Sequence, residues 1–202
     1  MGSGGMRSGL RRYRFRDGPR GGAAGGGSTW RPPAEINTQI KEKTLAAAVR
    51  HFTANYKDAD HEWSYVVDDQ GFVYSYHEGD KGSVRAPMPA DHRTSRWRRG
   101  GKREKDHSKA RYTVLHNHPD GSAFSKTDLL TTASSNREKG IMAIGNKFAY
   151  SVRKGPGFKS DAFIKALKAA QPVGKDYDDA VHNWLTKNQR RFGYSYERVS
   201  TG

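Results

Sequence analysis

Hydrophobic residues recur along the chain with two different spacings, which predict a mixture of helices and strands. Apolar positions three or four residues apart indicate helices over residues 36–56, 125–139, 158–170 and 177–185. Short apolar or alternating runs indicate strands over residues 63–67, 72–76, 112–116, 141–144 and 148–152. The turn residues 68–71 join the first two strands into a hairpin. We therefore expect an α+β (α/β-like) fold with a central mixed β-sheet flanked by helices.

Composition divides the chain into three parts. Residues 1–33 are rich in glycine and arginine and have too few apolar residues to fold, so we expect a flexible arm. Residues 34–172 are expected to form the ordered domain, which contains a basic loop at residues 88–110. Residues 173–202 are expected to form a C-terminal helix and tail outside that domain.

Charge and cysteine content limit the classes of partner and site. The net charge of +15 favours contact with nucleic acid through the arm and the basic loop, although both segments also fit a solvated linker. The absence of cysteine excludes disulfides and thiolate zinc sites. No apolar run approaches the ~20 residues of a membrane span, and residues 1–27 lack the apolar stretch of a signal peptide. We therefore expect a cytoplasmic protein or a delivered effector with no membrane partner.

Metal-ligand chemistry is concentrated in residues 116–128. His116 and His118 lie two residues apart at the end of a predicted strand, so both side chains project from one face. Asp128 falls in the first turn of the next predicted helix, which brings a carboxylate back toward that strand end. Two imidazoles and one carboxylate leave the fourth position of a tetrahedral zinc ion open to water, as a catalytic site requires. Ser125 and Asp128 also fit a helix capping box, which is the simpler interpretation of that pair alone.

The order strand, His-x-His-Pro, glycine turn and Ser-x-x-Asp resembles the motif of the JAMM/MPN (JAB-domain) zinc metalloprotease family. The His-Asn-His-Pro opening is similar to the bacterial and phage branch of that family. The resemblance covers residues 36–170 and implies a JAMM/MPN-like (cytidine-deaminase-like) core. It also implies zinc bound by His116, His118 and Asp128, and hydrolysis of an amide bond in a protein or peptide substrate such as a ubiquitin-like tail.

The family also has an upstream glutamate, and Glu62 at the start of the 63–67 strand resembles it. The resemblance implies that Glu62 is the general base that activates water, and that Ser125 donates a hydrogen bond to the oxyanion. A solvated carboxylate at a strand end is the alternative interpretation of Glu62, and Glu78 is a second candidate for the base.

Two other functions remain open at the level of sequence. The loop from Pro119 to Phe124 is one residue shorter than the usual form of the family, which favours a JAB-like binding module without catalysis. The basic charge favours a nucleic-acid-targeting toxin or effector domain. The letters His-Asn-His do not support an HNH nuclease, because that fold spreads its three residues over a hairpin and a helix.

Overall fold

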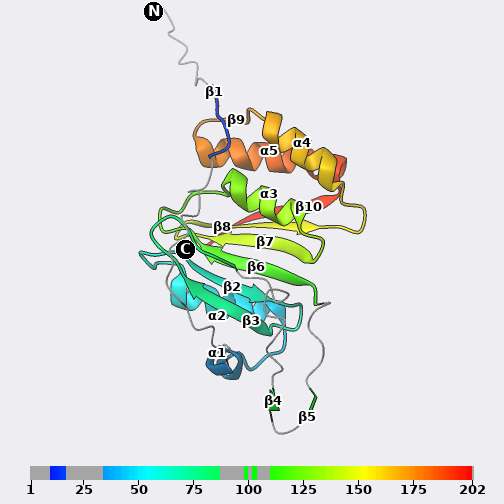
Figure 1. Ribbon diagram of the computed structural model, residues 1–202. Coiled ribbons are helices and arrows are strands. Elements are labelled where there is room, and N and C mark those ends of the chain that lie inside the picture. The colour runs from blue at the N-terminus through cyan, green and yellow to red at the C-terminus, as the bar shows by residue number, and fades with distance from the viewer. Residues whose placement is uncertain (1–9, 17–33, 87–97, 100–101, 104–109, 202) are drawn as a thin grey trace, which may run out of the picture.

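The computed structural model describes residues 10–16, 34–86, 98–99, 102–103 and 110–201 (Figure 1). Within them lies a six-stranded sheet with the strand order β10-β8-β7-β6-β2-β3. Its strands are β2 (Trp63–Val67), β3 (Val73–Glu78), β6 (Tyr112–Asn117), β7 (Glu138–Ile144), β8 (Phe148–Lys154) and β10 (Tyr194–Ser200). All neighbouring strands are antiparallel except β6 and β7, which are parallel. The expected α+β fold with a mixed sheet flanked by helices is therefore confirmed.

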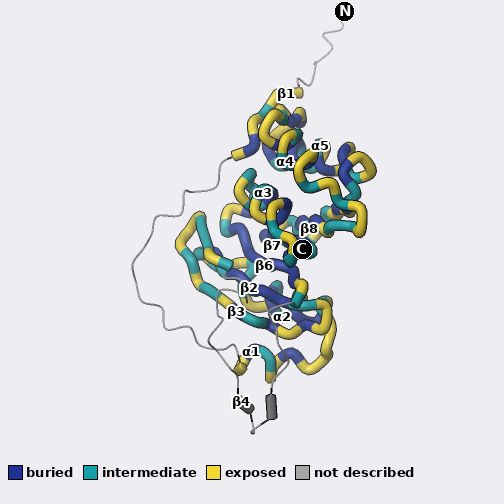
Figure 2. Tube along the Cα trace, turned by 45° about the vertical axis from the view of Figure 1, so that its right-hand side comes forward, coloured by how far each residue is buried: buried dark blue, intermediate teal, exposed yellow. Residues whose placement is uncertain are grey.

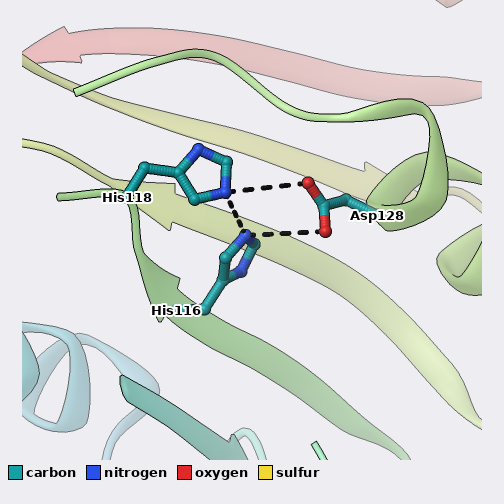
Figure 3. Close-up of side chains that lie close together, drawn as sticks. All are labelled: His116, His118 and Asp128. Atoms are coloured by element: carbon teal, nitrogen blue, oxygen red, sulfur yellow. Dashed lines mark hydrogen bonds and ion pairs between the residues drawn. The ribbon is translucent and has the colours of Figure 1, made fainter. Parts of the chain in front are cut away.

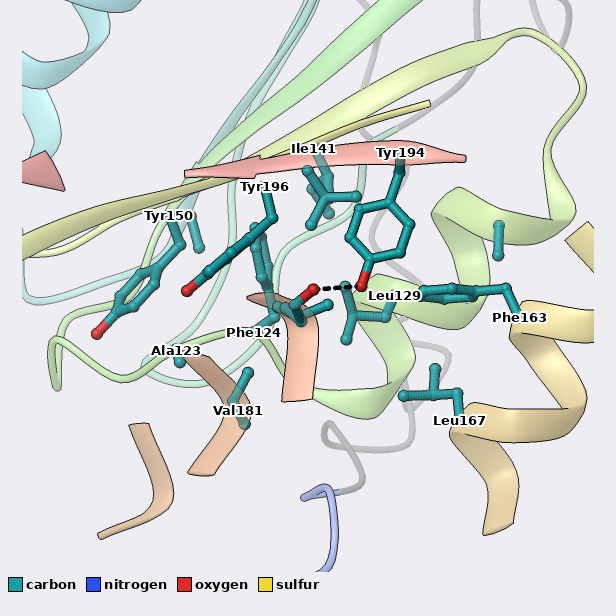
Figure 4. Packing of buried hydrophobic residues seen from close by; sticks show 14 of the residues in the cluster. Ala123, Phe124, Leu129, Ile141, Tyr150, Phe163, Leu167, Val181, Tyr194 and Tyr196 are labelled. Carbon is teal, nitrogen blue, oxygen red and sulfur yellow. Dashed lines mark hydrogen bonds between the residues drawn. The ribbon is translucent and has the colours of Figure 1, made fainter. Parts of the chain in front are cut away.

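Helices cover both faces of the sheet (Figure 1). The helices are α1 (Ala34–Gln39), α2 (Leu45–Tyr56), α3 (Lys126–Ser134), α4 (Ser160–Ala169) and α5 (Tyr177–Phe192). One buried cluster joins α1 and α2 to the sheet, and a larger one joins α3, α4 and α5 to the opposite face. Figure 4 shows part of the larger cluster, and Figure 2 shows that buried residues concentrate in the sheet between the helices.

The alternation of side chains along β6 decides which layer each of its last residues faces. Val114 belongs to the cluster under α3, whereas Leu115 belongs to the cluster under α2. Because successive side chains of a strand point to opposite faces, His116 lies on the α3 side and Asn117 lies on the α2 side. The end of β6 therefore places an imidazole on one face of the sheet and a side-chain amide on the other.

The connection from β6 through α3 to β7 positions the candidate site. Parallel neighbouring strands require a crossover, and here α3 supplies it. Ser125 begins the helix as its N-cap and forms a capping box with Asp128. Gly121 has φ +70°, and a Cβ there would lie 2.8 Å from Asn146 Oδ1, so the loop between strand and helix needs glycine at this position. The N-terminal end of α3 is thus held next to the end of β6.

The hairpin predicted at residues 63–76 is present as β2 and β3. The carboxylate of Asp68 accepts hydrogen bonds from the backbone N–H groups of Gln70 and Phe72, which fixes the turn. Pairing continues past the end of β3, because Glu62 N donates to Asp80 O and Gly79 N donates to Glu62 O, at 2.8 and 2.7 Å. Glu62 therefore lies at the open end of the hairpin, as expected.

Two predicted helices differ from those observed. The helix expected over residues 36–56 is two helices, because residues 41–43 are polar and exposed and Thr44 adopts an extended conformation as the N-cap of α2. The helix expected over residues 125–139 ends at Ser134, and Glu138 begins β7. The serines and asparagine at residues 134–136 favour a turn over a helix, and the buried side chain of Glu138 belongs to the sheet.

The C-terminal tail is also a correction. The helix expected over residues 177–185 continues to Phe192, and residues 194–200 form the edge strand β10. Tyr194 and Tyr196 are buried in the same cluster as α3, so this segment belongs to the main core and not to a unit beyond residue 172. Its alternation of tyrosine with polar residues is the period-two signal of a strand, and that signal was overlooked.

Part of the N-terminal arm is ordered as well. Strand β1 (Arg11–Arg12) pairs with β9 (Val173–Gly174), and Phe15 is buried with its ring centroid 5.4 Å from that of Trp184. The expectation of a flexible arm therefore does not hold for residues 10–16. Apolar burial of Phe15 and the β1–β9 ladder explain the order, because they attach this segment to α5.

Most of the basic loop expected at residues 88–110 lies outside the described residues. Within it, β4 (Arg98–Arg99) and β5 (Lys102–Arg103) pair with each other as a short antiparallel ladder. Among the helices that the structure describes, none has both the length and the apolar character needed to cross a bilayer.

Candidate metal centre

His116 and His118 come from the end of β6 and the residue just beyond it. The backbone of this segment is fixed by the parallel ladder with β7, in which His116 pairs with Ala143. The N–H of His118 extends that ladder by donating to Ile144 O at 3.1 Å. Both side chains are nearly fully buried, at 3% and 7% exposure. The sequence spacing of two residues therefore places both imidazoles on the α3 side, as expected.

The two imidazoles and the Asp128 carboxylate converge on one point (Figure 3). The Nε2 atoms of His116 and His118 are 2.9 Å apart. Asp128 approaches each of them at 3.7 Å, with Oδ1 toward His116 and Oδ2 toward His118. The ligand atoms of all three residues lie within 4.8 Å of one another. The structure thus brings together the three residues that the sequence predicted as metal ligands.

Hydrogen bonding fixes which nitrogen of His118 faces the shared point. Its Nδ1 lies 2.8 Å from the carbonyl oxygen of Ser122, which can only accept a hydrogen bond. Nδ1 therefore carries the proton, and in the neutral ring Nε2 presents its lone pair toward His116 and Asp128. A backbone carbonyl that orients a histidine in this way is typical of metal sites.

Asp128 is held by the residue that begins α3. Its Oδ2 accepts hydrogen bonds from the backbone N–H and from the hydroxyl of Ser125, both at 2.7 Å. Burial alone would raise the pKa of Asp128, but the nearby imidazoles of His116 and His118 and the Ser125 hydrogen bonds outweigh it and hold the pKa well below its ordinary value. The carboxylate therefore stays ionised. Capping and metal-ligand interpretations of Ser125 and Asp128 are thus compatible in one geometry.

The donor set fits a divalent metal ion. For a tetrahedral ion with ligands at about 2.1 Å, neighbouring ligand atoms are roughly 3.4 Å apart. The observed separations of 2.9 and 3.7 Å lie on either side of that value. With Nδ1 of His118 protonated, its Nε2 can accept the hydrogen bond from His116 Nε2, and a metal ion at this point would take the place of the shared proton. Among the described residues, this group can hold a metal ion.

Glu62 lies close to this group and in an unusual environment. It shares a face of the sheet with Ser64, whose register partner is His116. The residue is 8% exposed. Burial raises its pKa to about 7, while the charge of His118 lowers the pKa and that of Asp128 raises it. The alternative of a solvated strand-end carboxylate is therefore wrong. Glu78, the second candidate for the base, is exposed.

Sequence reasoning did not single out Asn117, which lies between the two histidines. It is fully buried on the opposite face, and its side chain donates to His61 O at 2.9 Å and accepts from Trp63 N. The available signal was a polar amide at a position that alternation assigns to an apolar layer. Histidines away from the site make other contacts: His51 binds Gln39, and His182 binds Tyr196.

No protein-family model matches the chain, and neither a curated protein nor a solved structure matches it.

Proposed function

We propose that the chain is a zinc-dependent metallopeptidase or isopeptidase that hydrolyses an amide bond. In this proposal His116, His118 and Asp128 hold the zinc ion, and Glu62 is the general base. The observation that carries it is the convergence of three ligand atoms within 4.8 Å, next to a buried carboxyl with a pKa raised to about 7. A perturbed carboxyl beside a cation site is a common property of catalytic centres.

Zinc is the metal that the ligands favour. Imidazole nitrogen with carboxylate oxygen suits zinc, and three protein ligands leave the fourth position open. A bound zinc ion would act as a Lewis acid and lower the pKa of its water from about 16 toward roughly 7. Two histidines and one carboxylate also bind iron(II) in oxygenases. The buried Glu62 favours hydrolysis, because a hydrolase needs a proton acceptor at the site.

Glu62 and Ser125 then have distinct roles in the proposed reaction. Glu62, with a pKa of about 7, would accept a proton from water and donate it to the leaving amine at neutral pH. Ser125 would orient Asp128 through its two hydrogen bonds. The expected donation from Ser125 to an oxyanion stays a prediction, since its hydroxyl is directed at Asp128 in this arrangement.

The substrate class rests on the resemblance to the JAMM/MPN family. The order of the glutamate, the two histidines, the serine and the aspartate along the chain supports membership of that family, with a core of its type. A protein or peptide substrate, such as a ubiquitin-like tail, is therefore proposed. Contact of the basic segments with nucleic acid remains a separate proposal that the net charge of +15 supports.

The test is a cleavage screen with the full chain. The zinc-loaded protein is incubated with a panel of peptides and ubiquitin-like fusions, before and after metal removal by a chelator. We expect cleavage that stops with the chelator and returns with added zinc. Equal cleavage by the zinc-free chain would contradict the proposal. Metal-dependent cleavage of DNA alone, unaffected by Glu62→Gln, would favour the effector alternative.

A further inference from the structure

The residue between the two histidines connects the metal ligands to the general base. Asn117 ends β6, and its side chain is fully buried on the α2 side of the sheet. Its Nδ2 donates to His61 O at 2.9 Å, and its Oδ1 accepts from Trp63 N. These two backbone groups flank Glu62 on either side. The Asn117 side chain therefore forms hydrogen bonds with the backbone immediately before and immediately after Glu62, the candidate base.

These two hydrogen bonds lie where the regular backbone pairing of β2 with β6 stops. Backbone pairing between β2 and β6 ends at the register pair Ser64 and His116. Beyond that pair, the amide of Asn117 takes the place of backbone hydrogen bonds by offering one donor and one acceptor. On its other side, Glu62 is paired through its own backbone with Gly79 and Asp80. Loss of the Asn117 side chain would leave Glu62 attached to the hairpin, and joined to β6 only through the pairing of β2 that begins at Ser64.

The histidines do not depend on the Asn117 side chain in the same way. The backbone of Asn117 pairs with Ile144 in the parallel ladder, and His118 N donates to Ile144 O. The opposite orientation of His116 and His118 also keeps their imidazoles away from the amide. Removal of the amide should therefore move the base without removing the ligands.

We propose that Asn117 is a positioning residue that holds Glu62 at its working distance from the metal ligands. The inference rests on the proposed function for its catalytic meaning, but the anchoring itself is a property of the metal-free chain. A displacement of about 1 Å at a reacting group costs on the order of 100-fold in rate. The distance between Glu62 and the metal ligands thus depends on the side-chain amide of Asn117.

Asn37 offers a matched control. Its Nδ2 donates to Val73 O at 2.8 Å and its Oδ1 accepts from Val73 N at 2.9 Å. Asn37 thus also forms two hydrogen bonds with a backbone segment, but at the start of β3, away from Glu62. Asn37→Ala therefore removes equivalent hydrogen bonds without touching the segment that carries the base.

The experiment compares Asn117→Ala, Asn117→Ser and Asn37→Ala with the wild-type chain. Amide hydrogen exchange reports the Trp63 N–H, and carboxyl ¹³C NMR of the metal-free protein reports the titration of Glu62, assigned with Glu62→Gln. In Asn117→Ala we expect faster exchange at Trp63, the direct consequence of the lost hydrogen bond, and a lower Glu62 midpoint, because the loosened segment becomes more exposed to water. Zinc affinity, measured by calorimetry with zinc alone, should stay within a few fold. Cleavage should fall on the order of 100-fold.

Several outcomes separate the possibilities. A folded Asn117→Ala protein with wild-type exchange at Trp63 and a wild-type Glu62 midpoint would overturn the inference, as would an equal shift in Asn37→Ala. Should Asn117→Ala fail to fold, Asn117→Ser decides the question, since its hydroxyl is too short to reach both backbone groups. A wild-type chain that binds no zinc overturns the proposed function instead, and the metal-free NMR experiment still decides whether Asn117 anchors Glu62.

Discussion

Two buried polar clusters lie at opposite ends of α3, and they differ in how their charges are satisfied. At the C-terminal end, Thr132 donates to Glu138 and Lys154 donates to the carbonyls of Thr132 and Ser135. The cluster thus contains its own hydroxyl and ammonium donors, and the ammonium also suits the negative end of the helix. At the N-terminal end, the Nε2 atoms of His116 and His118 lie 2.9 Å apart, at hydrogen-bond distance, and the carboxylate of Asp128 lies 3.7 Å from each of them.

The comparison teaches that burial of a carboxyl does not identify a catalytic group by itself. Burial raises the pKa of both Glu62 and Glu138 to about 7. Glu138 accepts a hydrogen bond from the Thr132 hydroxyl through Oε1 and lies near the charge of Lys154, while its Oε2 is buried without a hydrogen-bond partner. Glu62 lies near the group of His116, His118 and Asp128, which could hold a metal ion. Among the described residues, the two clusters therefore differ in the ligands that they offer, because the cluster near Glu62 brings two imidazole nitrogens and a carboxylate oxygen within reach of one cation.

Removal of a proposed metal ligand should have the largest effect on zinc binding and on cleavage. In His118→Ala we expect loss of zinc binding and of all zinc-dependent cleavage, because only two ligands remain. His182→Ala is the control, since His182 contacts Tyr196 and not the metal group. Calorimetry with zinc and the cleavage assay measure both variants. Zinc affinity in His118→Ala equal to that of the control would contradict the ligand assignment.

Substitution of the two carboxyls sharpens the comparison further. Glu62→Gln should lower the cleavage rate by about 10²–10⁴-fold with zinc still bound, because a general base is lost. Glu138→Gln should leave the rate within a few fold, although both changes remove a buried carboxyl with a raised pKa. Steady-state kinetics at saturating zinc measures both. Similar rates for the two variants would remove the distinction between the clusters.

Glu138 should also affect stability in a predictable pH window. Its pKa is raised from 4.5 to about 7 in the folded chain, so folding favours the protonated form. Its contribution is full below pH 4.5 and is lost as the pH rises to about 7, by up to about 3 kcal/mol. Denaturant unfolding at several pH values should show a shallower decline in Glu138→Gln than in the wild type. Identical pH profiles would show that Glu138 has an ordinary pKa.

The smallest expected effect on stability belongs to Ser125. Ser125→Ala should lower the free energy of unfolding by about 1 kcal/mol through loss of the N-cap. Zinc affinity should fall roughly 10–100-fold, because a partner of the ligand Asp128 is removed. A further fall of about 10²–10³-fold in the rate at full zinc occupancy would support the oxyanion role, and an unchanged rate would contradict it.

The sequence predicted the site better than the outer parts of the fold. His116, His118 and Asp128 could be placed together because strand alternation and a helix start are local properties with clear spacing. The sequence also placed Glu62 at the open end of the hairpin. Its burial could not be predicted from a segment that reads as polar, since that burial depends on pairing with residues 79–80 and on the neighbouring strand.

The missed elements depend on contacts that are distant along the chain. Strand β10 pairs with β8, and Phe15 packs on Trp184. In both cases the partner lies far away along the chain. The role of Asn117 was also hidden, because its partners lie more than 50 residues away. Local periodicity predicts which residues form an element, but it does not predict which distant backbone a buried amide will bind.

The proposed function requires that the group of His116, His118 and Asp128 at the N-terminal end of α3 binds zinc. Metal analysis by mass spectrometry of the full chain, after zinc loading and removal of free metal, tests it most directly. The account predicts about one zinc ion per wild-type chain and almost none in Asp128→Ala. A wild-type chain without zinc, a chain that takes up iron(II) in preference, or full zinc occupancy in Asp128→Ala would contradict it.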